Sequence, residues 1–358
     1  MSLAGALSVI GHGMVTAAGR DGPSTFAALR AKISGVRTAN LWDPTAGKNL
    51  GAGRPVLHQW SEGPETMGSL VTLAAQECLA AFEADVRVDD VPIVVLLSPR
   101  QRPHRWPDLE DVVLRHLTAS FGTRVPRMVL AHGSTGIIRA IEFAADLMRR
   151  HGNHCLIIGA ESFLRQPIVR HYIDQGRLLC GANSNGFIPG EAACAVLIGR
   201  AGSTRRPELV ITGLGSGQEQ AGTGGNDERT SKAEGLTLAV RSALELAQVP
   251  FWSLNYTICD INGERYKFKE AVITRGRLDR APPPGVPPRP AGYMDVWHPI
   301  EGTGEIGAAI FPCMLGWAFE ASTKGYAPGE SALLHASEEN GERAALVTRF
   351  QVPERSNG

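Results

Sequence analysis

The sequence predicts an α/β fold in which helices cover mostly parallel or mixed β-sheets. Stretches typical of strands alternate with stretches typical of helices along the chain. "VPIVVLLS" (91–98) has the length and β-branching of a buried strand, and residues 136–150 have the apolar spacing of a helix. The order starts again after residue 200, where "ELVITGLGSGQEQAG" (208–222) resembles "LSVIGHGMVTAAG" (7–19). We therefore predict two related halves, residues 1–203 and 204–358.

The other predicted elements follow from the same patterns of apolar residues and turn signals. Further helices are expected at 22–35, 67–84, 231–248 and 304–321, the last interrupted by Pro312. Further strands are expected at 127–131, 155–161, 192–199 and 255–263. Asn340-Gly341 is the strongest short turn signal in the chain and predicts a hairpin over 331–350.

The composition is ordinary for a soluble globular protein, with 43% apolar residues, 20% charged residues and a formal net charge of +0. This balance gives no support for binding to nucleic acid or to an anionic membrane surface. No apolar run is long enough to span a bilayer and no leader is recognised, so we expect a cytoplasmic protein. The six cysteines lack C-x-x-C spacing and lie mostly in apolar runs, which predicts structural roles.

No cofactor or metal ion is expected from the motifs. The histidines have no ligand spacing, and the glycine-rich "GSGQEQAGTGGN" lacks the lysine of a phosphate-binding loop. A Pro/Arg-rich loop at 275–290 is predicted to be an exposed connector, because proline is excluded from helix interiors and central strands. A role for this loop in binding a partner is the alternative.

Three stretches resemble a known family. They are "VIGHGMVTAAGRDGPSTFAALRAKISGVR" (9–37), "GSTGIIRAIEFAADLMRRHGNHCLIIGAES" (133–162) and "NGFIPGEAACAVLIGR" (185–200). Their order and their glycine, alanine and glutamate positions are similar to those of the β-ketoacyl-ACP synthases, or ketosynthases, of the thiolase superfamily. The resemblance implies a thiolase-like fold with two βαβ-rich halves in a layered α-β-α-β-α architecture.

The resemblance also shows where this chain departs from the family's chemistry. Family members transfer an acyl group to a cysteine at a helix N-terminus, and two histidines then assist decarboxylation of a malonyl thioester. Here the nucleophile position falls on Gly133, the first histidine position on Asn262 and the second on Gly304. The family's Gly-Phe-Gly-Gly stretch is replaced by "ASEENGE" (336–342). These losses together predict a chain that keeps the scaffold without the condensing reaction.

Ser134 and Asn262 are the candidate catalytic residues. A one-residue shift in the comparison would place Ser134 at the nucleophile position, but a serine at a helix start is more often an N-cap. The amide of Asn262 can donate to an oxyanion, but Asn-Gly is also an ordinary turn. The further candidates for a substrate pocket are His132, Gly133, Thr135, Phe187, Glu264, His298 and Glu305. In the family, the two loops that carry the histidines converge. If the corresponding loops around Asn262 and Gly304 do so here, Asp260 joins Glu264 and Glu305 in a carboxylate cluster.

Three functions remain open at this point. The first is a non-condensing scaffold, or a subunit that binds acyl groups or a carrier protein. It would form a homodimer through the sheet edge and the helix near the stretch 9–37. Its further partner would be an acyl carrier protein or acyl-CoA. The second is an acyltransferase or thioesterase that uses Ser134 with Asn262 in an oxyanion site. The third is an interaction protein recognised through the loop at 275–290.

Overall fold

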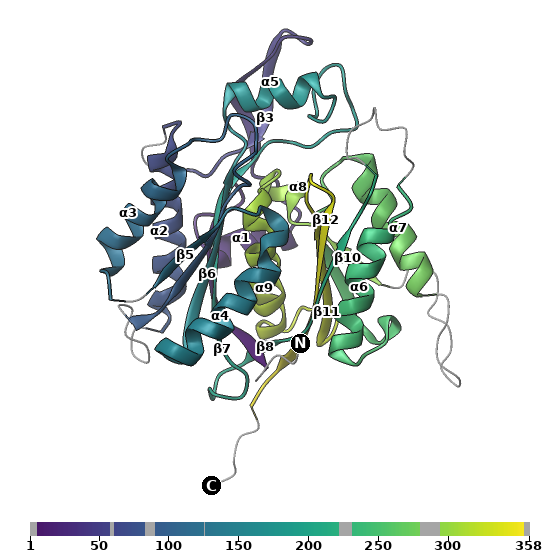
Figure 1. Ribbon diagram of the computed structural model, residues 1–358. Coiled ribbons are helices and arrows are strands. Elements are labelled where there is room, and N and C mark those ends of the chain that lie inside the picture. The colour runs from purple at the N-terminus through teal and green to yellow at the C-terminus, as the bar shows by residue number, and fades with distance from the viewer. Residues whose placement is uncertain are drawn as a thin grey trace.

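The computed structural model describes residues 6–57, 61–82, 90–124, 126–221, 231–279 and 294–353. Within these residues one sheet of ten strands runs through the molecule (Figure 1). Two long strands, β1 (Leu7–Val15) and β8 (Glu208–Gln218), lie side by side at its middle and pair antiparallel. Both are largely buried, which agrees with their apolar sequences.

The strands on either side of this central pair follow the same pattern. Outward from β1 come β7 (Glu191–Arg200), β6 (His154–Ser162), β4 (Ile93–Leu96) and β5 (Arg127–Leu130). Outward from β8 come β12 (Glu342–Gln351), β11 (Ser331–Ser337), β9 (Tyr256–Cys259) and β10 (Asp295–Trp297). On both sides the inner pairs are antiparallel and the outer pairs are parallel. The division of the chain at residues 203 and 204 stays a prediction.

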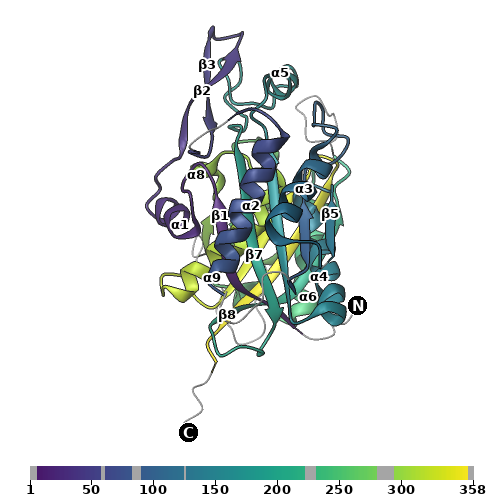
Figure 2. The ribbon, with the colours of Figure 1, turned by 90° about the vertical axis from the view of Figure 1, so that its left-hand side faces the viewer.

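The sheet has two arms, one from β1 outward to β5 and one from β8 outward to β10. Helices form three layers around these arms (Figures 1 and 2). The outer layers are α2 (Pro64–Ala80) with α3 (Leu109–Phe121), and α6 (Glu234–Ala247) with α7 (Arg265–Leu278). Between the two arms lie α4 (Ile137–His151) and α9 (Ile310–Thr323), surrounded by the largest apolar cluster of the core. The predicted layered α/β architecture is confirmed, and it places the starts of α4 and α9 near the centre of the molecule.

Smaller elements complete the described chain. Short helices α1 (Gly22–Arg30), α5 (Gln166–Asp174) and α8 (Ile300–Thr303) lie outside the main layers. Strands β2 (Val36–Asp43) and β3 (Lys48–Gly53) form a separate hairpin that projects from one end of the molecule (Figure 2). Single 3₁₀ turns occupy Ser134–Gly136, Phe251–Ser253 and Gly307–Ala309. None of the described helices is both long enough and apolar enough to cross a bilayer.

The structure confirms some of the local predictions and corrects others. The hairpin at Asn340-Gly341 is present, with Gly341 at φ +89°. Pro312 does not interrupt α9, because it lies in the first turn of the helix, where a proline displaces no intrahelical hydrogen bond. The opening strand β1 is flanked by β7 and β8, so the prediction of a free sheet edge there is wrong. Among the described strands, the ten-stranded sheet ends at β5 on one side and at β10 on the other. Residues 280–290 of the predicted Pro/Arg loop lie outside the described residues, and residues 275–278 belong to α7.

Candidate functional site

The site begins at the turn between β5 and α4, where the family's nucleophile is expected. Gly133 has φ +65°, a backbone conformation that favours glycine. Its N–H donates to the carbonyl of Leu97 at 2.9 Å, and this bond holds the turn against the residue that directly follows β4. The 3₁₀ turn that starts at Ser134 leads directly into α4. This arrangement presents N–H groups of a helix start toward the interior, a favourable environment for a negative charge.

A carboxylate of the protein itself occupies this environment. Glu338 lies in the turn between β11 and β12, and its Oε2 accepts hydrogen bonds from the Ser134 N–H at 2.8 Å and from Ser134 Oγ at 3.0 Å. A Cβ atom added at Gly133 would lie 2.0 Å from the same oxygen. Ser134 is therefore not the N-cap that we predicted: its hydroxyl donates to Glu338, and no side-chain cap is made at this helix start.

Arg102 holds the Glu338 carboxylate from the other side. Its Nη2 lies 3.1 Å from Glu338 Oε1, and its Nη1 lies 3.7 Å from Glu161 Oε2. The guanidinium also lies over the ring of Phe163, 4.7 Å from the ring centroid. All three charged side chains are 4% exposed or less, so their attraction is only weakly screened by solvent.

The loops around Asn262 and Glu305, which the resemblance matches to the family's histidine loops, converge on a second part of the same network. Asn262 Nδ2 donates to Glu305 at 2.6 Å and to Glu264 at 3.1 Å. The Lys267 ammonium lies 2.7 Å from Asp260 and 3.3 Å from Glu305. The structure thus brings the three carboxylates of the predicted cluster together, with a lysine and an amide between them. The Asn262 side chain also accepts from the Glu264 N–H at 3.1 Å, as in an ordinary asparagine turn.

Arg177 joins the two parts of the network. Its guanidinium donates to both oxygens of Glu264, at 2.7 and 3.1 Å, in a two-point pairing. Its Nη1 lies 3.0 Å from Glu339, which also accepts from the Tyr172 hydroxyl at 2.7 Å. The predicted pocket residue Phe187 is buried beside it, with the Arg177 guanidinium 5.9 Å from the ring centroid.

Burial and neighbouring charges shift the pKa values of several groups in this network. Burial raises the pKa of Glu161 to about 7, against the opposing effect of Arg102. Burial would also raise the pKa of Glu339, but Arg102, Arg177 and the Tyr172 hydroxyl overcome it and hold the value at about 2. Burial alone would lower the pKa of Lys267, but the carboxylates of Asp260 and Glu305 hold it well above its ordinary value.

Little space is left inside this network, which we call the central network. The cavity that its residues line has a volume of about 20 Å³. This is room for about one water molecule. A thioester or an acyl chain has no place to bind here unless several buried ion pairs separate. The described residues that line this cavity include neither a cysteine nor a histidine.

Four of the predicted site residues have other roles. Thr135 donates to Glu342 at 2.7 Å, and His132 lies 3.4 Å from Arg139 in a partly exposed position. Gly304 has φ +73°, and a Cβ atom there would lie 2.9 Å from the Pro189 carbonyl oxygen, so a histidine does not fit without a shift of the backbone. His298 lies in a different cavity, where it pairs with Glu301 at 2.9 Å.

The sequence patterns did not identify several residues that dominate the site. Arg102, Arg177, Lys267, Glu338 and Glu339 were not among the predicted site residues, although each is part of the central network. One signal was available: Glu338 and Glu339 fall in the stretch that replaces the family's Gly-Phe-Gly-Gly. In the described part of the chain, no group of three His, Cys, Asp or Glu side chains is arranged to hold a metal ion.

Comparisons with known proteins show a similarity of fold. No family model matches the chain, and no curated protein matches it. Solved structures match along nearly the whole chain at low sequence identity. One is a complex of a type II polyketide acyl-carrier protein with its ketosynthase bound to the hexaketide, with a TM-score of 0.77, 13% identity and coverage of 96% of this chain and 99% of that chain.

Two further solved structures also match nearly the whole chain at low sequence identity. A complex of a ketosynthase with its chain length factor from Xenorhabdus doucetiae has a TM-score of 0.74, 13% identity and coverage of 97% of this chain and 98% of that chain. A β-ketoacyl synthase from Burkholderia phymatum has a TM-score of 0.68, 16% identity and coverage of 97% and 100%. The chain therefore has the thiolase-like fold of ketosynthases and chain length factors, with a network of buried ion pairs at its centre.

Proposed function

We propose that this protein is a non-condensing, ketosynthase-like subunit that acts through association with other proteins. The observation that carries the proposal is the Glu338 carboxylate, which fills the position beside Gly133 and Ser134 and accepts from both donors of Ser134. An acyl transfer at this position needs a nucleophile and a vacant oxyanion site. Here a fixed anion takes the N–H donor that an oxyanion would use.

The remaining volume supports the same proposal. A cavity of about 20 Å³ does not admit a substrate, whereas small-molecule sites generally measure about 300–1,000 Å³. Opening it requires the separation of charges such as Arg102 from Glu338 and Lys267 from Glu305, which are all buried. Separating a buried pair leaves uncompensated charges and costs about 3–5 kcal/mol.

A turnover assay tests the proposal. The protein is incubated with malonyl-CoA or malonyl carrier protein, with and without an acyl thioester as the acyl donor, and released carbon dioxide and condensed products are measured. We expect the parent to release no more of either than a Ser134→Ala variant and a no-protein control. Turnover by the parent above both controls would contradict a non-condensing role.

A partner is expected along the outer edge of β5. Among the described residues no strand pairs with that edge, and its side chains are only partly buried. Unpaired strand edges readily pair with another chain. We propose a homodimer here, and solved structures of similar fold that contain a ketosynthase with a chain length factor or a carrier protein support pairing in general.

The partner proposal has its own measurement. Sedimentation velocity should give twice the monomer mass of 38.2 kDa for the parent and the monomer mass for Val129→Lys, which places a charge in β5. Because Val129 also packs against the core, the thermal unfolding of this variant must show that it is folded. A Val272→Lys variant, on an exposed position of α7, is the matched control and should remain a dimer. A monomeric parent that also fails to bind acyl carrier protein in calorimetry would count against this part of the proposal.

A second candidate function rests on the 3.0 Å contact of Ser134 Oγ with Glu338. A carboxylate that accepts a serine proton is one way to activate the hydroxyl, so a thioesterase or acyltransferase remains the alternative. It has less support, because Ser134 is 4% exposed and the same carboxylate is held by Arg102. An acyl-serine adduct would decide for this alternative.

A further inference from the structure

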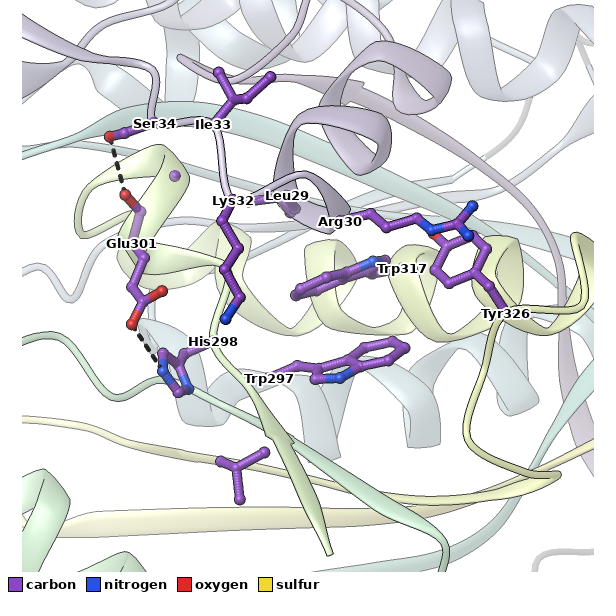
Figure 3. Close-up of a pocket in the computed structure, with 12 residues that line it drawn as sticks. Leu29, Arg30, Lys32, Ile33, Ser34, Trp297, His298, Glu301, Trp317 and Tyr326 are labelled. Atoms are coloured by element: carbon purple, nitrogen blue, oxygen red, sulfur yellow. Dashed lines mark hydrogen bonds and ion pairs between the residues drawn. The ribbon is translucent and has the colours of Figure 1, made fainter.

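A second cavity lies at the surface, away from the central network. It has a volume of about 490 Å³ and is formed where the end of α1 meets β10, α8 and the end of α9 (Figure 3). It shares no lining residue with the cavity of the central network, within the described chain. Its volume is in the range of small-molecule sites, about 300–1,000 Å³. We call it the α1 cavity.

One wall of the α1 cavity is built from aromatic rings. Trp297 stacks on Trp317 with a centroid separation of 4.8 Å, and Tyr326 lies 6.3 Å from Trp297 in a similar orientation. Trp317 is 6% exposed, so the wall is anchored in the core. Such a wall is rigid and offers a flat ligand either offset stacking or an edge-to-face contact. It favours a ligand with a planar ring system.

The charges of the α1 cavity are unbalanced toward the positive. In Figure 3 the Lys32 side chain extends toward His298 and Trp297, and no described residue forms an ion pair or hydrogen bond with its ammonium. The Arg30 guanidinium lies 4.3 Å from the centroid of Tyr326 and has no carboxylate partner in the described chain. Glu301 supplies the carboxylate among the described lining residues, and it is engaged by His298 at 2.9 Å. An anion therefore suits this cavity better than a cation.

The backbone at Lys32 is a separate observation that points to the same side chain. Lys32 has φ +54°, in the left-handed region, directly after the end of α1. The N–H of Ile33 donates to Ala28 at 2.8 Å and that of Lys32 to Leu29 at 3.1 Å, which closes the helix end. Glycine is the usual residue at this position of a helix end. A lysine kept in the left-handed conformation, with its ammonium extended into a cavity, supports a binding role for this side chain.

The donors available limit the kind of anion. A phosphate group is usually held by several N–H donors or by a two-point arginine contact. Here the backbone N–H groups of Lys32 and Ile33 are used in the helix end, and Arg30 lies over Tyr326. A single ammonium beside an aromatic wall matches a singly charged carboxylate.

We propose that the α1 cavity binds a planar aromatic carboxylate, with its ring against Trp297 and Trp317 and its carboxylate paired with the Lys32 ammonium. The site is independent of the central network, and the proposal does not rest on the non-condensing role.

Isothermal titration calorimetry with two isosteric probes tests the proposal. The probes are 2-naphthoate and the neutral 2-naphthamide. We expect the parent to bind both and to prefer the carboxylate by about fivefold, the size of one partly exposed charge pair. In Lys32→Asn, where asparagine tolerates the left-handed backbone, 2-naphthoate should bind about fivefold more weakly and 2-naphthamide should be unaffected. Lys48→Asn, the same change at an exposed lysine of β3, should alter neither.

Four results would overturn the proposal. They are no binding of 2-naphthoate by a folded parent at millimolar concentration, equal affinity for the two probes, an unchanged carboxylate preference in Lys32→Asn, and tighter binding of adenosine monophosphate than of 2-naphthoate. The last would assign the cavity to nucleotides instead. Thermal unfolding of each variant checks that a loss of binding is not a loss of folding.

Discussion

The central network and the α1 cavity both combine aromatic rings with cationic side chains, but their charges are satisfied differently. In the central network Arg102, Arg177 and Lys267 each face carboxylates of the same chain, and about 20 Å³ is left open. In the α1 cavity Lys32 and Arg30 have no carboxylate partner in the described chain, and about 490 Å³ is open. The first region uses its charges to hold itself closed, whereas the second leaves the Lys32 ammonium available to a ligand.

The difference shows that the position expected for catalysis and the position open to a ligand are not the same in this protein. The central network occupies the position where the ketosynthase resemblance places catalysis, yet its donors and acceptors are engaged with one another. The α1 cavity is lined partly by residues of the similar stretch 9–37 but by none of the positions matched to the family's catalytic residues. It has the volume of a binding site and a lysine ammonium without a partner among the described residues. The contacts at each site, and not the fold alone, therefore indicate what this protein can do.

The largest effect should come from breaking the central network at its lysine. Lys267→Met leaves the carboxylates of Asp260 and Glu305 without their cation in a buried setting. We expect the free energy of unfolding to fall by about 3–5 kcal/mol in urea titrations.

Lys324→Met is the matched control for that change. Lys324 pairs with Glu320 at 2.6 Å, but its side chain is 54% exposed, so its loss should cost less than about 1 kcal/mol. Equal costs for the two variants would mean that Lys267 is not held in a buried network, and the comparison between the two regions would fail.

The second effect is a pH dependence that comes from Glu161. Its folded pKa of about 7 lies above its ordinary value of 4.5, because burial disfavours the charged form. Its contribution to stability is therefore fully present below pH 4.5 and is lost as the pH rises through 7. Glu161→Gln should gain stability relative to the parent between about pH 5 and pH 8, by about 2.5 kcal/mol, in denaturant titrations at each pH.

His335 gives the control of opposite sign. Burial lowers its pKa from 6.5 to about 4, so the folded protein holds this proton less tightly than the unfolded chain does. The parent loses stability from this group as the pH falls below 6.5. His335→Gln should gain about 2 kcal/mol on the parent between about pH 8 and pH 5. A pH-independent difference for either variant would contradict the burial that the structure assigns to that group.

A smaller effect is expected from the cap of α1, the helix that carries Arg30 and leads to Lys32. The Asp21 carboxylate accepts from the Ser24 N–H at 2.7 Å in a capping box. Asp21→Ala should lower the free energy of unfolding by about 1 kcal/mol. Asp108→Ala is the control, because Asp108 precedes α3 without a side-chain cap and its removal should change stability by no more than a few tenths of a kcal/mol. Equal losses would show that local capping does not hold α1.

The smallest effect has the opposite sign. Lys32→Gly should raise the free energy of unfolding by about 0.5 kcal/mol, because it relieves the left-handed backbone at some cost in unfolded-chain entropy. Gln248→Gly changes a similar position, with φ +56° at the end of α6, and should give a similar gain. Only the change at Lys32 should also weaken binding of 2-naphthoate. A loss of stability in Lys32→Gly would mean that the lysine supports the fold and would weaken its assignment to a ligand.

The architecture was predictable where apolar patterns follow the core. Helix α4 buries Ile137, Ala140, Ile141 and Ala144, which recur at the spacing of one helical face. Helix α7 was missed for a physical reason: its buried face consists of Lys267, Glu270 and Thr274, whereas Phe268 and Val272 are exposed. When a helix is packed through polar side chains, its apolar residues lie on the exposed face, so their spacing does not indicate the buried face.

The central network was beyond local sequence patterns because its contacts are long-range. The hydrogen bond between Ser134 and Glu338 spans 204 positions of the chain, and that between Arg177 and Glu264 spans 87. The motif comparison did locate Gly133, Asn262, Gly304 and the substituted "ASEENGE" stretch. The loss of the family's catalytic groups at these positions stays a prediction, and the side chains that fill the site could be found only from the structure.

The most direct test of the closed centre is the intact mass of the protein after incubation with a panel of acyl-CoA and acyl-carrier thioesters, measured beside Ser134→Ala. With Glu338 in contact with Ser134 and about 20 Å³ of free volume, we predict that the parent keeps its unmodified mass with every thioester. A mass increase of one acyl group in the parent, absent from Ser134→Ala, would contradict this account and establish a serine acyl-enzyme.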